Sequence, residues 1–231
     1  MTSFPPFSSA TASRRRPYLA NLSICIVATV LTLLLAACGD TAKWHSVDIS
    51  GTLPPLAFTM TRANDGKIVT AADYRGRIVL LYFGYTYCPD VCPTTLANIA
   101  GLLERIGSEA KDVRVLFVTV DPNRDTLPLL KEYTAAFSPR IDALRGTPDE
   151  IAALARRYRV VYSVTPAANG RPYEVTHSAA IYVFDAKGDV RLLVPSFDSD
   201  KPDIAGTAQD LARLAHGTAP NGLLARVTSL L

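Results

Sequence analysis

Residues 78–96, IVLLYFGYTYCPDVCPTTL, decide how this chain folds. The uninterrupted apolar run at 78–83 is typical of a central strand that is buried on both faces. Pro93 suits the first position of a helix, so we expect the strand to lead through a short loop into a helix with Cys92 as its N-cap. Cys88 and Cys92 then lie together where a buried strand passes into a helix.

Around this stretch, strands alternate with helices at first, and hairpin-linked strands follow later in the chain. This order predicts an α/β fold with a mixed central sheet flanked by helices, parallel βαβ units at its centre and an added β-hairpin. The expected strands are 58–60, 67–70, 78–83, 113–120, 159–164, 172–176, 178–185 and 189–194, and the expected helices are 93–106, 126–137, 147–158 and 202–216. Asn169-Gly170 and Lys187-Gly188 mark two of the hairpin turns.

Length and charge limit the kind of protein. With 231 residues the chain has room for one domain with a sizeable core, which we place at 53–216. Residues 1–38 are expected to be a leader, 39–52 a tether and 217–231 a C-terminal tail. The net charge of +3 comes from three leader arginines, and without them 21 basic residues balance 21 acidic ones. This neutral balance argues against a nucleic-acid partner.

The leader has the layout of a secretory signal. Three arginines at 14–16 precede an uncharged, apolar stretch from Pro17 to Gly39. The stretch contains Leu35-Ala36-Ala37-Cys38, which is similar to a bacterial lipobox in which Cys38 would carry the lipid. A bilayer span takes about 20 apolar residues, so an uncleaved membrane anchor is the alternative. Both interpretations place the domain on the extracytoplasmic, periplasmic side of a bacterial cell membrane.

Cys88, Cys92 and His177 form the candidate metal site. Two soft thiolates and one imidazole suit Cu(I), and they hold Cu(II) when a further ligand is added. The N-terminus of a helix stabilises thiolates, which favours metal binding by the cysteine pair. His177 is expected at the start of the strand 178–185, and an antiparallel position of that strand would bring it beside the ends of the parallel strands. The alternatives are a structural disulfide and an ordinary strand-edge histidine.

Asp121 directly follows the strand 113–120, so we expect it at the same sheet edge as Cys88. It is predicted to support the metal ligands, and a plain turn residue is the alternative. Arg124 and Asp125 are predicted to be a loop ion pair with each other and an N-cap for the helix that starts at Thr126.

Three motifs together resemble the SCO/SenC family. They are Gly84–Thr94 (GYTYCPDVCPT), Val120–Thr126 (VDPNRDT) and Thr176–Ser178 (THS). The resemblance covers roughly residues 50–215 and implies a thioredoxin-like, membrane-tethered protein that helps load copper into cytochrome c oxidase. It implies Cys88, Cys92 and His177 as copper ligands, with Asp121 in support. Tyr87 departs from the family pattern, in which many members have His directly before the first cysteine.

The alternative function is a thiol–disulfide oxidoreductase that acts on cysteines of a partner protein, with Cys88 and Cys92 as its redox pair. Their spacing is one residue longer than the C-x-x-C of thioredoxin-like redox motifs. Those enzymes also usually carry a proline before the strand that faces the cysteines, whereas Thr176 is followed here by His177. We therefore expect a metallochaperone. The resemblance implies the copper-bearing subunit of the oxidase as its partner, and other copper chaperones or thiol reductants are further candidates.

Overall fold

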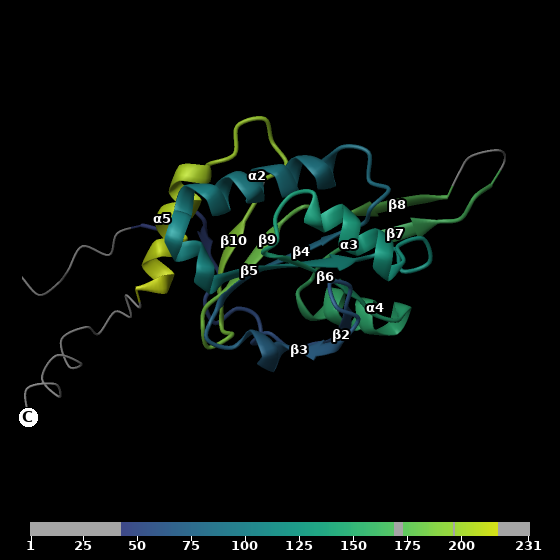
Figure 1. The fold of residues 1–231 in the computed structure, drawn as a ribbon, viewed down its shortest axis with the longest axis horizontal. Coiled ribbons are helices and arrows are strands. Elements are labelled where there is room, and N and C mark those ends of the chain that lie inside the picture. Colours follow the sequence, from purple (N-terminus) through teal and green to yellow (C-terminus); the bar gives the residue numbers. More distant parts are fainter. Residues whose placement is uncertain (1–42, 169–172, 196, 217–231) are drawn as a thin grey trace, which may run out of the picture. The chain divides into compact units, whose positions relative to one another are not determined.

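An eight-stranded mixed sheet organises the domain in the computed structural model (Figure 1). The structure describes residues 43–168, 173–195 and 197–216. The strand order across the sheet is β1-β10-β9-β4-β5-β6-β2-β3. These strands are β1 (Val47–Asp48), β2 (Thr59–Arg62), β3 (Ile68–Thr70), β4 (Ile78–Gly84), β5 (Val113–Thr119), β6 (Ile141–Arg145), β9 (Ile181–Phe184) and β10 (Val190–Val194).

β4 and β5 form the centre of the sheet and run parallel, with pairs that extend from Ile78–Val113 to Gly84–Thr119. Every residue of β4 is buried, as the continuous apolar run predicts for a strand covered on both faces. β6 pairs parallel with β5, whereas β9 pairs antiparallel with β4. The predicted parallel centre with antiparallel neighbours is thus confirmed, and the carboxyl ends of β4 and β5 meet at one edge of the sheet.

Helices cover both faces of this sheet. They are α2 (Val91–Ile106), α3 (Leu127–Ala135), α4 (Pro148–Arg157) and α5 (Ile204–Ala215), with short 3-10 turns at η1 (Ala71–Tyr74) and η2 (Gly107–Asp112). α2 and α5 contact each other on one face, and α4 lies on the opposite face (Figure 1). α2 buries Leu96, Ile99 and Leu103, which share the stripe expected from their helical spacing. The site-bearing helix is therefore fixed against the core along its length.

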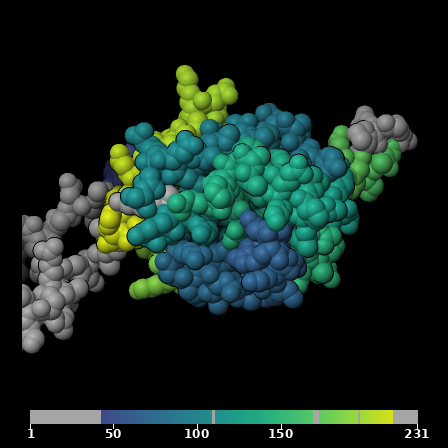
Figure 2. All heavy atoms as spheres, in the orientation of Figure 1, coloured from purple at the N-terminus to yellow at the C-terminus, as the bar shows by residue number. Residues whose placement is uncertain are grey.

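A separate two-stranded sheet, the arm, consists of β7 (Tyr162–Thr165) and β8 (Glu174–His177). The two strands are antiparallel, with Tyr162 opposite His177 and Thr165 opposite Glu174. The arm projects from the body of the domain (Figures 1 and 2). It is the predicted added hairpin, although the expected turn at Asn169-Gly170 lies outside the described residues.

Two strands lie where none was predicted. β6 has Asp142 in its centre, and this carboxylate accepts a 2.9 Å hydrogen bond from the Tyr74 hydroxyl and lies 3.7 Å from the Arg62 guanidinium. Partners that are distant in the sequence therefore stabilise an acidic residue inside a strand. β1 lies within the predicted tether, where it pairs antiparallel with β10.

The predicted leader (1–38), with Cys38, and the predicted tail (217–231) lie outside the described residues. Within residues 43–168, 173–195 and 197–216, no helix has both the length and the apolar character that a membrane crossing requires.

Candidate metal centre

The loop from β4 to α2 carries both cysteines. Cys88 is half-buried, Cys92 is fully buried, and both are free thiols. The helix begins at Val91 with Asp90 as its N-cap, so the prediction of Cys92 as the N-cap was wrong by two positions. Cys92 lies instead in the first helical turn, where its backbone N–H donates to the Cys88 sulfur over 3.4 Å. A helical N–H group therefore faces the half-buried sulfur and favours its thiolate.

Gly84, the last residue of β4, provides the space for the Cys92 sulfur. A Cβ atom at this position would lie 2.9 Å from the Cys92 Sγ and 2.6 Å from the ring of Phe117. Both distances are shorter than normal van der Waals contact, so any side chain here would displace the sulfur or the ring. A residue without a Cβ is therefore required where the strand passes beneath the site.

His177 reaches the cysteines from the arm. It is the last residue of β8, not the first residue of the next strand as predicted. Its Nε2 lies 3.1 Å from the Cys92 Sγ, and its Nδ1 lies 3.1 Å from the carbonyl oxygen of Ser178. Because a carbonyl only accepts, Nδ1 carries the hydrogen in the neutral ring, and Nε2 presents its lone pair toward the thiols. The rings of Tyr82 and Tyr85 meet the imidazole edge-on or nearly so.

Cys88, Cys92 and His177 together offer three metal-ligating atoms that lie within 4.8 Å of one another. Within the part of the chain that the structure describes, no other group of three or more His, Cys, Asp or Glu side chains is arranged in this way. The donor set of two sulfurs and one imidazole nitrogen is the set that suits copper or another soft metal ion. The three residues that the sequence selected are therefore brought together by the fold.

The two thiols differ in protonation. The pKa of the Cys88 thiol is lowered to about 3, and the largest cause is a hydrogen bond from the Cys92 side chain, whereas burial opposes the shift. The interaction with Cys88 raises the pKa of the Cys92 thiol, and its burial adds to this shift. The metal-free site therefore holds a reactive thiolate at Cys88, nearer the surface, and a protonated thiol at Cys92, in the core.

Asp125 holds the loop that leads from β4 to the cysteines, and this role was not predicted. Its carboxylate accepts hydrogen bonds from the Thr86 hydroxyl and the Thr119 hydroxyl, each at 2.5 Å, and from the backbone N–H of Thr86 at 3.1 Å. The helix N-cap is instead Thr126, whose hydroxyl accepts from Leu129. The fully buried Asp125 thereby joins the ends of both central strands, and its burial raises the pKa of its carboxyl group.

Asp121 lies at the predicted sheet edge and is fully buried. Its carboxylate binds the Arg124 guanidinium and accepts a 2.9 Å hydrogen bond from the hydroxyl of Tyr173. The expected ion pair between Arg124 and Asp125 is therefore wrong, because Arg124 pairs with Asp121. Since Tyr173 directly precedes β8, Asp121 is connected to the strand that carries His177.

A pocket of about 270 Å³ opens beside the thiolate. Its wall consists of Tyr85, Cys88, Pro89, Asp90, Val91, Val175, Thr176 and His177. The pocket is lined mainly by apolar surface, and two of the three candidate ligands border it. A metal ion or a partner's sulfur can therefore approach Cys88 and His177, whereas Cys92 lies behind them.

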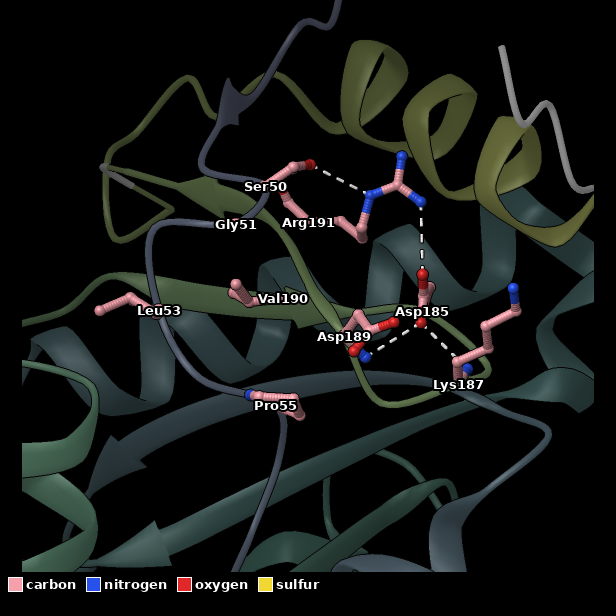
Figure 3. A pocket seen from close by; sticks show the side chains of 9 residues that line it. All are labelled: Ser50, Gly51, Leu53, Pro55, Asp185, Lys187, Asp189, Val190 and Arg191. Carbon is pink, nitrogen blue, oxygen red and sulfur yellow. Dashed lines mark hydrogen bonds and ion pairs between the residues drawn. The ribbon is translucent and has the colours of Figure 1, made fainter. Parts of the chain in front are cut away.

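A second pocket, of about 470 Å³, lies at the turn between β9 and β10 (Figure 3). Its charged groups bind each other: the Arg191 guanidinium lies 3.3 Å from the Asp185 carboxylate and donates to the Ser50 hydroxyl at 3.1 Å. Asp185 also accepts from the backbone N–H groups of Lys187 and Asp189. Neither cysteine nor histidine lines this pocket, so its polar groups serve the turn and the candidate metal chemistry belongs to the first site.

The sheet with helices on both faces and a Cys-Cys-His group at the ends of its central strands define a thioredoxin-like protein with a candidate soft-metal site. The model of the family described as SCO1/SenC matches residues 55–215. This chain belongs to the SCO1/SenC family.

Relatives of known structure share the fold over most of the described domain. ScoI from Bradyrhizobium japonicum, solved with copper bound, is 37% identical and superposes with a TM-score of 0.61, covering 69% of this chain and 98% of that one. ScoI from Arabidopsis thaliana, also with copper bound, is 31% identical with a TM-score of 0.62, covering 70% of this chain and 98% of that one.

A relative by sequence, the mitochondrial SCO2 homolog of Bos taurus, is 42% identical over 125 residues, which make up 53% of this chain and 47% of that protein. The chain thus spans about half the length of that relative.

Proposed function

We propose that this chain is a membrane-tethered copper chaperone that binds copper through Cys88, Cys92 and His177 and helps assemble the copper centre of cytochrome c oxidase. The observation that carries the proposal is the convergence of two sulfurs and an imidazole nitrogen within 4.8 Å. The copper-bound ScoI structures, which share the fold and the family, support the choice of metal.

The donor set fits Cu(I), and with a further ligand it also fits Cu(II). Two thiolates provide the soft ligands that Cu(I) prefers, and the imidazole adds a donor that Cu(II) prefers. The charge at Cys88 is already present before metal binds, so one proton, that of Cys92, has to leave on loading. The Nδ1 hydrogen bond to Ser178 holds the imidazole in the tautomer that leaves Nε2 available.

The pocket beside Cys88 suits transfer to a partner. Cys88 and His177 border the opening while Cys92 lies in the core, so an incoming ligand would meet the outer two donors first. The copper-bearing subunit of the oxidase is the acceptor that family membership favours, and other copper chaperones or thiol reductants are further candidate partners. The apolar leader supports attachment to the periplasmic face of a bacterial membrane, by a lipid on Cys38 or by a spanning helix.

The second candidate function is thiol–disulfide exchange with a partner protein. It is favoured by one observation, the low pKa of the partly exposed Cys88 thiol with the Cys92 thiol directly behind it. Cys88 would attack a partner disulfide, and Cys92 would then resolve the mixed disulfide, so that the partner is reduced and the Cys88–Cys92 pair is oxidised. His177 has no required part in that exchange, and its position against Cys92 favours metal binding.

A metal titration tests the proposed function. We expect the reduced chain to bind one Cu(I) and one Cu(II) in separate titrations, each tightly enough to compete with a chelator. If the chain binds neither Cu(I) nor Cu(II) but still exchanges disulfides with a partner, the oxidoreductase function would be supported instead.

A further inference from the structure

The arm is held to the body of the domain by polar contacts that are separate from the pairing of β7 with β8. β8 pairs with β7 alone, so the strand that carries His177 takes no part in the central sheet. One contact is the Tyr85 hydroxyl, which donates to the carbonyl of Val175 over 2.8 Å. Besides the contact of His177 with Cys92, a further group of contacts gathers around one side chain, that of Arg124.

Arg124 lies between the cysteine loop and the arm. Its guanidinium carbon lies 4.2 Å from the ring centre of Tyr173, which precedes β8, and 5.1 Å from that of Tyr87, which precedes Cys88. A guanidinium donor also reaches the carbonyl of Tyr173 over 3.4 Å. Both aromatic contacts are within the range in which a cation is attracted to the face of a ring. One cation is therefore shared by the residues that lead into a sulfur ligand and into the imidazole ligand.

Asp121 fixes the position of this cation. Its fully buried carboxylate binds the Arg124 guanidinium with one oxygen and accepts from the Tyr173 hydroxyl with the other. The backbone N–H of Asp121 donates to the Thr119 hydroxyl at the end of β5. Arg124, Asp121, Tyr87 and Tyr173, named here the arginine latch, are thus attached to the rigid centre of the sheet.

We infer that Arg124 is a positioning residue that holds the arm, and with it His177, against the cysteine loop. The inference rests on the proposed function for its copper readout, but it also makes a claim about the metal-free protein. When Arg124 is replaced, the arm keeps its own hydrogen bonds and the hydrogen bond from Tyr173 to Asp121, but it loses the contacts of the guanidinium with the ring and the carbonyl of Tyr173. His177 then spends less time within bonding distance of Cys92, while the cysteine pair keeps its geometry, which Gly84 and Asp125 determine.

A comparison of Cu(II) affinity with Cu(I) affinity distinguishes this role of Arg124 from a general loss of structure. Cu(II) depends on the imidazole, whereas Cu(I) is held by the two thiolates. Loss of an outer partner of a metal ligand typically weakens affinity about 10–100-fold. Arg124→Met should therefore weaken Cu(II) binding about 10-fold or more, reduce the thiolate-to-Cu(II) absorption, and change Cu(I) affinity less than about threefold. Arg124→Lys, which keeps the charge, should recover part of the Cu(II) affinity.

The decisive experiment compares Arg124→Met with Arg157→Met in the reduced full chain. Arg157 is a matched control, because its guanidinium also donates to a backbone carbonyl, that of Pro55 at 2.9 Å, and also lies by a tyrosine ring, that of Tyr158. We expect amide hydrogen exchange in residues 173–177 of the metal-free protein to become about 10-fold faster in Arg124→Met and to remain unchanged in Arg157→Met. If Arg124→Met does not fold, Asp121→Asn provides the same comparison with a weaker expected effect.

Exchange at 173–177 and Cu(II) affinity equal to the wild type in a folded Arg124→Met protein would overturn the inference. An equal loss of Cu(I) and Cu(II) affinity would also overturn it, because the effect would then be a general one. If the wild type binds no copper, the proposed function fails, and the exchange measurement alone decides whether the latch holds the arm.

Discussion

The Nε2 atom of His177 lies 3.1 Å from the Sγ atom of Cys92, although 85 residues separate them in the chain. One residue comes from the first turn of a helix on the central sheet, and the other from the end of a projecting arm. This contact turns a pair of thiols into a three-donor site.

Replacing either cysteine should abolish tight Cu(I) binding. Cys88→Ser and Cys92→Ser each leave one thiolate and one imidazole, which are too few soft donors to compete with a strong Cu(I) chelator. We expect the stoichiometry of Cu(I) to fall from one to near zero in both variants, as measured by competition at fixed chelator concentration. Unchanged Cu(I) affinity in both single variants would exclude this site.

The Cys88 thiol should stay reactive in acid. Since the folded protein lowers its pKa to about 3, the thiolate persists down to that pH and is lost only below it. The rate of alkylation by iodoacetamide in the metal-free protein should therefore change little between pH 8 and pH 5, where an ordinary thiol slows by roughly three orders of magnitude.

The same measurement in Cys92→Ala identifies the cause. The hydrogen bond from the Cys92 side chain is the largest contribution that lowers the pKa of Cys88, and the variant removes it while the backbone N–H of residue 92 remains, so the pKa should rise and a dependence on pH should return. A flat profile in both proteins would show that Cys92 is not the donor. A steep profile in the wild type would contradict the low pKa itself.

Gly84→Ala should destabilise the fold and disturb the site together. Overpacking of this kind typically costs about 1–3 kcal/mol, and here the added methyl group meets the Cys92 sulfur and the Phe117 ring. Gly101→Ala is the matched control, because its Cβ would meet only Ile204 at 3.8 Å in an ordinary contact. It lies within α2 and should be stabilising by about 0.5–1 kcal/mol.

Denaturant unfolding of the reduced proteins measures both effects. A Gly84→Ala protein as stable as the wild type, with unchanged Cu(I) affinity, would mean that the strand end yields without moving Cys92.

Much of this arrangement could be predicted from the sequence, because local patterns determine it. The apolar run of β4 and the position of Pro93 predicted a buried strand followed by a helix, and the cysteines are there. β6 escaped prediction because Asp142 interrupts its apolar pattern, and only Tyr74 and Arg62, which are distant in the chain, make that acid acceptable.

The same limit explains the errors around the site. Asp125 precedes a helix, as an N-cap residue does, yet its side chain turns inward to Thr86 and Thr119, which no local pattern reveals. The available signal was that Asp125 follows Asp121 by four residues, and that Asp121 comes directly after a buried strand. His177 was placed one strand too late because β8, whose residues are mostly not buried, and the fully buried β9 are each four residues long and are separated by only three residues.

The predicted leader, residues 1–38, indicates that the protein is attached to a membrane. We expect the mature protein to fractionate with membranes, and to be released when residues 1–38 are replaced by a cleavable secretory signal. Cys38→Ser distinguishes the two anchors: loss of lipid labelling with continued membrane retention indicates a spanning helix, and release indicates a lipid. Wild-type protein found free in the cytoplasm would contradict both.

The Cu(II) affinity of His177→Ala tests the copper site most directly, with His45→Ala as its control. His45 is a histidine whose ring lies 3.3 Å from Asp203, outside the Cys-Cys-His group. We predict that His177→Ala binds Cu(II) at least about 100-fold more weakly than the wild type while Cu(I) binding persists, because the imidazole is the donor that Cu(II) prefers and the two thiolates remain. His45→Ala should bind both ions as the wild type does. Undiminished Cu(II) binding by His177→Ala, together with normal oxidase assembly in cells that carry it, would show that His177 is only a strand-end histidine and that the copper site is not the one described.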